Sequence, residues 1–178
     1  MKLYLVRHGQ TDWNTGEVKA QGQTDIPLNS TGVAQAEALR DKIRGMEFDV
    51  CYVSPLSRAR QTAEIITEGK YELIFDDLLM ERYFGELEGT SPKTWNFDSF
   101  DRRVNYGEQG VEPVLTILER AEKFLERVRR ENASDARVLV VAHGTLIKML
   151  HFNILGYDDE TDFRAFHAKN CEMYEYKI

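Results

Sequence analysis

The chain has 178 residues, of which 42% are hydrophobic and 30% charged, and its net charge is -7. This length predicts a single domain, residues 1–178, that is long enough to bury a sizeable core. The acidic balance excludes a broad nucleic-acid surface, but it does not exclude a small phosphorylated ligand held by a few local cations. No apolar run approaches the roughly 20 residues of a membrane span, and the amino terminus is too short for a signal peptide. We therefore expect a cytoplasmic protein with no nucleic-acid or membrane partner.

The first predicted element is a buried strand over residues 3–6, which ends abruptly in Arg7, His8 and Gly9. An apolar run without polar interruption is typical of a central parallel strand. Ligands of open α/β sheets lie beyond the carboxyl ends of the strands, so Arg7 and His8 are expected to face a pocket. Gly9 is expected to let a ligand or a backbone segment approach closely. The polar segment 10–28 is predicted to be a long, functional loop.

Strands and helices alternate along the rest of the chain, which predicts a parallel sheet. Helices are predicted over 30–45, 57–67, 112–131 and 146–156, and strands over 48–53, 71–75, 137–142 and 171–176. Val33 and Leu115 are placed on or near the apolar faces of two helices, and Pro113 in the first turn of the third. Cys51 and Cys171 fall in predicted strands and are expected to be reduced thiols. The irregular, aromatic segment 85–110 is predicted to be an insertion or lid over the pocket.

Basic residues follow three of the predicted strands. The strand ending at Val53 leads to Arg58, and the strand ending at Ala142 leads to His143. If the three strands pair in parallel, their carboxyl ends lie along one edge, and the basic residues converge although they are far apart in sequence. These residues are Arg7, His8, Arg58 and His143. Two arginines and two histidines in one pocket indicate an anion as ligand.

The chemistry of this cluster points to phosphoryl transfer. A neutral imidazole such as His8 can act as a covalent nucleophile, and phosphorus is the plausible electrophile. Arginine forks match the oxygens of a phosphoryl group better than lysine does, so Arg7 and Arg58 suit this ligand. A protonated His143 would add a third cation, and Asn14 would donate from the first loop.

A leaving alcohol needs a proton, and Glu81 is the candidate donor because it follows a predicted strand end and stands beside Arg82. No metal is expected, since the arginines carry the charge. The rival interpretation is a metal held by His8 and His143, but no carboxylate lies at short, fixed spacing from either. His151 and His167 are interpreted as structural residues.

Five sequence blocks resemble the motifs of a known protein family. The first is Leu-Val-Arg-His-Gly-Gln-Thr over 5–11, with Trp and Asn at 13 and 14. The others are Asp-Ile-Pro-Leu over 25–28, Ser-Pro-Leu-Ser-Arg-Ala-Arg-Gln-Thr-Ala over 54–63, Glu-Arg-Tyr-Phe-Gly over 81–85 and Val-Ala-His-Gly over 141–144. In this order they resemble the histidine phosphatase superfamily, also called phosphoglycerate mutase-like. The matched blocks span nearly the whole chain.

This resemblance implies a three-layer α/β/α sandwich with a mostly parallel central sheet and one antiparallel edge strand. It implies that His8 becomes phosphohistidine and that Glu81 protonates the leaving group and then activates water. It also implies that the phosphoryl group is bound by Arg7, Arg58 and His143 with help from Asn14. Further candidates for phosphate or substrate binding are Gln21, Gly22, Gly144, Thr145, Arg82, Arg102 and Arg103.

The family contains phosphatases and mutases, and this short chain is more similar to the compact phosphatases. Thr145 stands where the glycolytic mutases carry asparagine, and Phe84 where they carry tyrosine. The pair Arg102 and Arg103 favours the mutases, which place two arginines in their insertion to hold a substrate carboxylate. We expect a metal-independent phosphomonoesterase that needs no cofactor, acts on a small phosphorylated metabolite and is a monomer or homodimer. The alternatives are a phosphoglycerate mutase and a non-catalytic phosphate-binding module.

Overall fold

The computed structural model describes residues 1–102 and 109–178, and the strands of this part form one sheet. The strands are β1 (Lys2–Arg7), β2 (Val50–Val53), β3 (Leu73–Phe75), β4 (Arg137–Ala142) and β5 (Met173–Lys177), in the order β3-β2-β4-β1-β5. The first four pair in parallel, whereas β5 runs antiparallel to β1. The predicted α/β class, with a mostly parallel sheet and one antiparallel edge strand, is confirmed.

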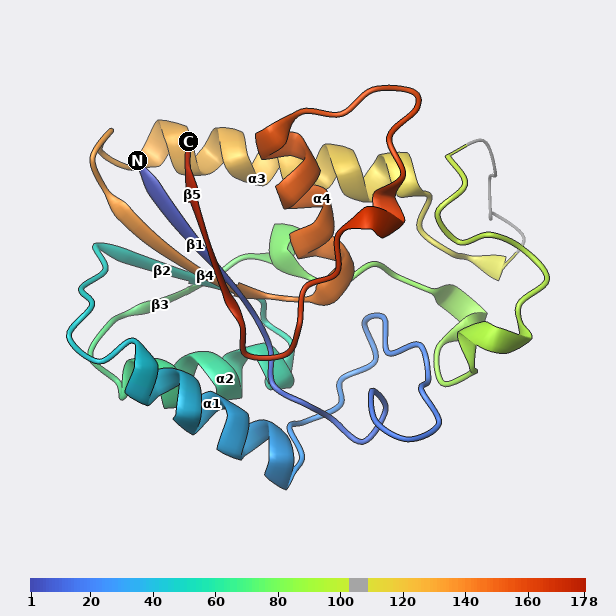
Figure 1. Cartoon of the computed structure of the whole chain (residues 1–178), viewed down its shortest axis with the longest axis horizontal. Coiled ribbons are helices and arrows are strands. Elements are labelled where there is room, and N and C mark those ends of the chain that lie inside the picture. Colours follow the sequence, from blue (N-terminus) through green and yellow to red (C-terminus); the bar gives the residue numbers. More distant parts are fainter. Residues whose placement is uncertain (103–108) are drawn as a thin grey trace.

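Helices cover both faces of the sheet, which gives three layers (Figure 1). They are α1 (Ser30–Lys42), α2 (Ser57–Thr67), α3 (Val114–Glu131) and α4 (Gly144–Leu155). Figure 1 shows α1 and α2 on one face and α3 and α4 on the other. Successive residues of a strand point to opposite faces. Leu3 and Leu5 of β1 accordingly pack in the core under α3 and α4, and Tyr4 and Val6 in the core under α1 and α2. Coverage on both sides explains why β1 is an uninterrupted apolar run. None of the described helices has the length and apolar composition to cross a membrane.

Several details differ from the predictions made from the sequence. The buried stripe of α1 consists of Gly32, Ala36 and Leu39, so Val33 lies beside it and is 38% exposed. Leu115 is likewise 46% exposed at the start of α3. Pro113 is the N-cap of α3 and not part of its first turn.

The aromatic insertion and the last strand differ in smaller ways. Within segment 85–102, short 3₁₀ helices form over Gly85–Leu87 and Pro92–Thr94, so this segment is not irregular throughout. Cys171 lies in the turn before β5, with a positive φ of 49°, and not in the strand itself.

The register of the sheet places the ends of β1, β2 and β4 side by side. Arg7 pairs with Ala142, and the residue after each of β1 and β2 is tied to β4 by a backbone hydrogen bond: His8 N donates to Ala142 O and Ser54 N to Val141 O, both at 3.0 Å. Gly9 packs against the start of α1, where a Cβ would lie 2.5 Å from the carbonyl oxygen of Gly32. The glycine thus allows a close backbone approach, as expected from the sequence. The loop after β1 and the insertion after β3 lie at this same end of the sheet (Figure 1).

Candidate active site

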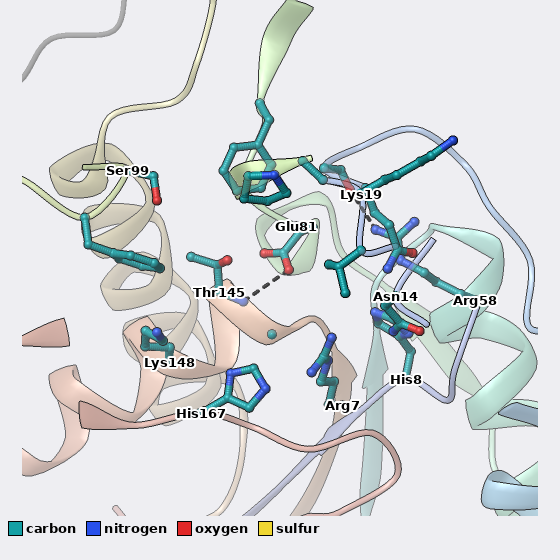
Figure 2. A pocket seen from close by; sticks show the side chains of 18 of the residues that line it. Arg7, His8, Asn14, Lys19, Arg58, Glu81, Ser99, Thr145, Lys148 and His167 are labelled. Atoms are coloured by element: carbon teal, nitrogen blue, oxygen red, sulfur yellow. Dashed lines mark hydrogen bonds between the residues drawn. The ribbon is translucent and has the colours of Figure 1, made fainter. Parts of the chain in front are cut away.

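A cavity of about 280 Å³ lies at the carboxyl ends of the parallel strands (Figure 2). The predicted catalytic residues among its lining are Arg7, His8, Arg58 and Glu81. The predicted binding residues among its lining are Asn14, Gln21, Gly22, Gly144 and Thr145. The structure therefore brings together side chains from β1, from the loop after it, from α2, from the segment after β3 and from α4.

His8 is held as a neutral imidazole whose Nε2 has no hydrogen-bond partner among the described residues. Its ring is 2% exposed, and Nδ1 lies 2.7 Å from the carbonyl oxygen of Gly9. A carbonyl only accepts, so the proton is on Nδ1 and Nε2 keeps its lone pair. Burial, followed by the charges of Arg58 and Arg7, holds the pKa of His8 well below 6.5. The side chain is therefore ready to act as a nucleophile at neutral pH.

Arg58 lies fully buried beside His8, and each nitrogen of its guanidinium donates to the protein. Nη2 donates to Gly22 O at 2.7 Å, Nη1 to Thr24 O at 2.9 Å and Nε to His143 Nδ1 at 3.2 Å. Burial lowers the pKa of Arg58 to about 10, so the group stays a cation at neutral pH. The guanidinium is fixed in place before any ligand arrives, which is the preorganisation that electrostatic catalysis needs.

His143 is neutral in this arrangement, so the condition under which it would add a third cation is not met. Its Nδ1 accepts from Arg58, so the ring proton is on Nε2, which donates to Ser54 Oγ at 2.7 Å. Burial and the neighbouring Arg58 hold the pKa of His143 well below 6.5. The ring centroid lies 5.2 Å from that of His8. In this arrangement His143 supports Arg58, and its contact with a phosphoryl group stays a prediction.

Two buried donors at the pocket have no hydrogen-bond partner within the described residues. Arg7 Nη1 donates to Ala168 O at 2.8 Å, but its buried Nε is unpaired. Asn14 Oδ1 accepts from Thr11 N at 2.9 Å, whereas its buried Nδ2 is unpaired. Buried polar groups without a partner are rare in native proteins, so two of them lining one cavity indicate an anionic ligand. Gly144 permits this placement, because a Cβ there would lie 3.4 Å from the guanidinium carbon of Arg7.

Glu81 lies at the N-terminus of α4. Its Oε2 accepts from Thr145 N at 3.1 Å (Figure 2), and Oε1 accepts from Leu146 N at 3.3 Å and from Arg82 N at 2.8 Å. The first-turn N–H groups of a helix have no partner within the helix and favour a negative charge. The carboxylate is thereby fixed at the wall of the cavity that also contains His8.

Arg82 is not among the residues that line the cavity, and its role in phosphate binding stays a prediction. Its Nε donates to Glu112 O at 2.7 Å and Nη1 donates to Ser99 O, while the guanidinium packs near the rings of Phe84 and Phe100. Glu81 lines the cavity, whereas the Arg82 guanidinium contacts residues of its wall, namely Phe84, Ser99 and Phe100. Arg82 therefore connects the insertion to the start of α3.

The structure also places Arg102 away from the pocket. Its Nη1 donates to Asp158 O at 2.8 Å, and the guanidinium packs on Phe163 at 5.1 Å from the ring centroid. Two arginines in the insertion are typical of mutases, in which they hold a substrate carboxylate. In this structure Arg102 contacts Asp158 and Phe163, so it does not lie where it could hold a substrate in the cavity. Arg103 lies outside the described residues.

Three residues of the site were missed in the sequence. Glu88 accepts from the backbone N–H groups of Gln23 and Thr24 and from that of Phe84, and so joins the first loop to the insertion. Lys148 and His167 line the cavity, although His167 was interpreted as structural. The signal for Lys148 was its position as the one charged residue in the apolar helix segment 146–150. His151 does have a structural role, since it stacks on Phe166 and pairs with Tyr176.

Comparison with known proteins identifies the family of this chain. A family model described as the histidine phosphatase superfamily (branch 1) matches residues 3–178. The chain belongs to this superfamily. The uncharacterized phosphatase PhoE of Bacillus subtilis is 36% identical over 159 residues, which cover 88% of this chain and 78% of that protein. A 2,3-bisphosphoglycerate-dependent phosphoglycerate mutase of Methylobacterium is 35% identical, with 89% and 83% covered.

A solved structure leads to the same superfamily. The crystal structure of a phosphoserine phosphatase from Entamoeba histolytica, in complex with 3-phosphoglyceric acid, matches with a TM-score of 0.81 and 30% sequence identity. The match covers 98% of this chain and 89% of that one. The chain is therefore a histidine phosphatase superfamily enzyme, either a phosphatase or a mutase.

Proposed function

We propose that the protein is a metal-independent phosphomonoesterase that hydrolyses a small phosphorylated metabolite through a phosphohistidine on His8. The observation that carries this proposal is the state of His8. Its Nδ1 is held by Gly9 O, its pKa is well below 6.5 and Nε2 is free, in a cavity that also contains two arginines and a carboxylate.

The reaction proceeds in two displacements. In the first, the Nε2 lone pair of His8 forms a bond to phosphorus while the ester P–O bond breaks. The carboxyl of Glu81 gives its proton to the departing oxygen and becomes the carboxylate that the N–H groups at the start of α4 stabilise. In the second, water attacks the phosphorus, the P–N bond breaks and Glu81 takes the proton of the water. The products are an alcohol and inorganic phosphate, and the enzyme returns to its starting state.

The cations of the site supply the charge that this transfer needs. A transferring phosphoryl group spreads negative charge over its three equatorial oxygens. Arg58 is fixed by three hydrogen bonds, and the unpaired donors of Arg7 and Asn14 are available for these oxygens. Within the described residues no group of three or more His, Cys, Asp and Glu side chains is placed to hold a metal ion. The expectation that no metal is needed stays a prediction.

The alternative function is a phosphoglycerate mutase, which transfers the phosphoryl group to a second substrate hydroxyl and not to water. The 35% identical mutase is the reason to retain it. Two observations favour hydrolysis: the 36% identical relative is named a phosphatase, and Arg102 is engaged with Asp158 away from the cavity.

The test is phosphate release from a panel of phosphomonoesters in excess EDTA, with wild-type protein and with His8→Ala. We expect turnover that persists in EDTA and falls by at least ~10⁴-fold in the variant. Brief incubation with a ³²P-labelled ester, followed by quenching in alkali, should leave label on the wild type and none on His8→Ala, because phosphohistidine is stable to base. Conversion of 3-phosphoglycerate to its 2-isomer without phosphate release would establish the mutase instead. Binding without any turnover would leave a phosphate-binding module.

A further inference from the structure

One end of the cavity carries a buried cation that the mechanism above does not use. Lys148 belongs to α4, is 6% exposed and lines the cavity. Figure 2 shows Lys148 and His167 on the opposite side of the pocket from His8 and Arg58, with Glu81 and Arg7 between the two sides. We call Phe100, Lys148 and His167 the distal end, and Arg7, His8, Asn14 and Arg58 the phosphate end.

The ammonium of Lys148 makes neither a hydrogen bond nor an ion pair with any residue in the described part of the chain. The ammonium makes a cation–π contact with Phe100, whose ring centroid lies 4.1 Å from Nζ. A buried ammonium is costly unless it is paired, and lysine is almost never fully buried alone. The aromatic face stabilises a cation but does not replace a carboxylate or carbonyl acceptor. The missing acceptor is thus expected to come from whatever fills the cavity.

The surroundings of Lys148 at the distal end favour a group of single negative charge. His167 lines the cavity close enough to Arg7 and Lys148 for both to lower its pKa, after the larger effect of burial. A neutral imidazole donates one hydrogen bond and Lys148 provides one full charge. That set suits a carboxylate, whereas a second phosphate group calls for the arginine forks found at the phosphate end.

We infer that the distal end is a specificity site in which Lys148, with His167, binds a carboxylate on the substrate while the phosphate end binds its phosphoryl group. This inference rests on the proposed function and adds a substrate class to it: small phosphomonoesters of carboxylic acids. The cavity of about 280 Å³ restricts the class to compact metabolites. Lys148 is then a residue of substrate recognition and takes no part in the bond-breaking steps.

The test uses three pairs of esters that match except for the carboxylate: 3-phosphoglycerate against glycerol 3-phosphate, phosphoserine against phosphoethanolamine, and 4-carboxyphenyl phosphate against phenyl phosphate. They span different distances between phosphate and carboxylate. The variants are Lys148→Met, which keeps the length without the charge, and Lys148→Arg, which keeps the charge. Lys123→Met, an exposed lysine on α3, is the matched control.

We expect the wild type to prefer the carboxylated ester of at least one pair by roughly tenfold or more in kcat/KM, the effect of one charge-assisted hydrogen bond. Lys148→Met should abolish that preference, because KM rises more for the carboxylated ester than for its partner ester. Lys148→Arg should retain the preference, and Lys123→Met should match the wild type.

Three results would overturn the inference: no pair with a preference above twofold, a preference that survives in Lys148→Met, or equal losses on both members of a pair. Each of these requires that the wild type hydrolyses the esters, so the proposed function would still stand. If the wild type hydrolyses none of the six esters but converts 3-phosphoglycerate to its 2-isomer, the hydrolytic function fails first and the inference fails with it.

Discussion

Arg58 at the phosphate end and Lys148 at the distal end of the cavity are held in different ways. At the phosphate end, Arg58 has a protein acceptor for each of its guanidinium nitrogens, and His8 is fixed through Gly9. At the distal end, Lys148 is buried against an aromatic ring without an ionic partner among the described residues. Asn14 of the phosphate end lies on the loop after β1, and the other residues of that end lie at the end of β1 or on α2, whereas Phe100 comes from the insertion.

This difference in how the two cations are held assigns Arg58 to catalysis and Lys148 to substrate recognition. A group that stabilises charge in the transition state acts best when the protein holds it before the substrate arrives. A group that selects one substrate discriminates best when the protein itself gives it no hydrogen-bond partner. A substrate that lacks the matching group then leaves it buried and unpaired. Substitutions at the phosphate end should therefore reduce kcat for every ester, and substitutions at the distal end should change which ester is preferred.

Among the substitutions that test this comparison, Arg58→Lys is expected to have the largest effect. Lysine cannot reproduce the planar fork that contacts Gly22 O, Thr24 O and His143 Nδ1 at once. We expect kcat/KM to fall by roughly 10³-fold for all esters. The free energy of unfolding should also drop by about 2 kcal/mol, because buried acceptors lose their donors. Steady-state kinetics and urea denaturation measure the two effects.

Arg60→Lys is the control for this change, since Arg60 lies on the same helix and its side chain is 51% exposed. Its activity and stability should equal those of the wild type. An Arg58→Lys protein with nearly full activity would show that a cation is sufficient at this place and that the fixed fork is not needed.

Glu81→Gln is expected to have the next largest effect. The amide keeps an oxygen for the N–H groups at the start of α4 but has no proton to give to a leaving alkoxide. We expect kcat/KM for an alkyl ester to fall by roughly 10²-fold. The loss for p-nitrophenyl phosphate should be much smaller, because nitrophenolate leaves without a proton. Equal losses for the two esters would contradict the role of Glu81 as general acid.

The convergence of the residues at the phosphate end could be predicted from the sequence. Parallel strands end at one edge of a sheet, so the position of Arg7, His8 and His143 after apolar runs was enough to bring them together. The neutral state of His143 was not visible, because it depends on burial and on the hydrogen bond from Arg58.

The distal end was harder to predict. Glu81 and Arg82 are neighbours in the sequence, and only the direction of the folded segment shows that Arg82 turns to Glu112 O. Segment 85–110 has no helical or strand periodicity, so nothing in it predicted that Phe100 would face Lys148. The lone lysine among the apolar residues of α4 was the one available signal.

A smaller effect is expected for Glu88→Gln, which tests how the two ends are connected. Glu88 accepts from Gln23 N, Thr24 N and Phe84 N and so holds the loop whose carbonyls fix Arg58 against the insertion. The side-chain amide of the Glu88→Gln variant would place its own N–H groups against these backbone N–H groups, so at least one of the hydrogen bonds would be lost. We expect kcat/KM to fall between roughly 10- and 100-fold through misplacement of Arg58, with substrate preference unchanged. Glu86→Gln, at an exposed position two residues earlier, should have no effect. A changed preference with full kcat would assign Glu88 to the distal end.

The smallest effect is expected on the free energy of unfolding, which the burial of the Lys148 ammonium lowers. The pKa of Lys148 in the folded protein is about 8, lowered from 10.5 mainly by burial. Of the charges around it, Glu81 and Asp162 raise this pKa, and Arg7 and Arg82 lower it. Below pH 8 the folded and unfolded states both hold the proton, so the cost of a buried ammonium is fully present. Between about 8 and 10.5 the unfolded chain keeps a proton that the folded protein has released, so stability rises with pH.

Lys148→Met removes this cost. We expect the variant to be more stable than the wild type by about 1 kcal/mol at pH 7, with the difference shrinking as the pH approaches 10. Urea denaturation of both proteins at pH 7, 8.5 and 10 measures it, and the thiols and tyrosines that titrate in this range cancel in the comparison. Lys123→Met should show no pH-dependent difference. A Lys148→Met protein that is less stable at pH 7 would mean that the ammonium is already well paired in the free protein, and the distal end would then have no unmet charge with which to select a carboxylate.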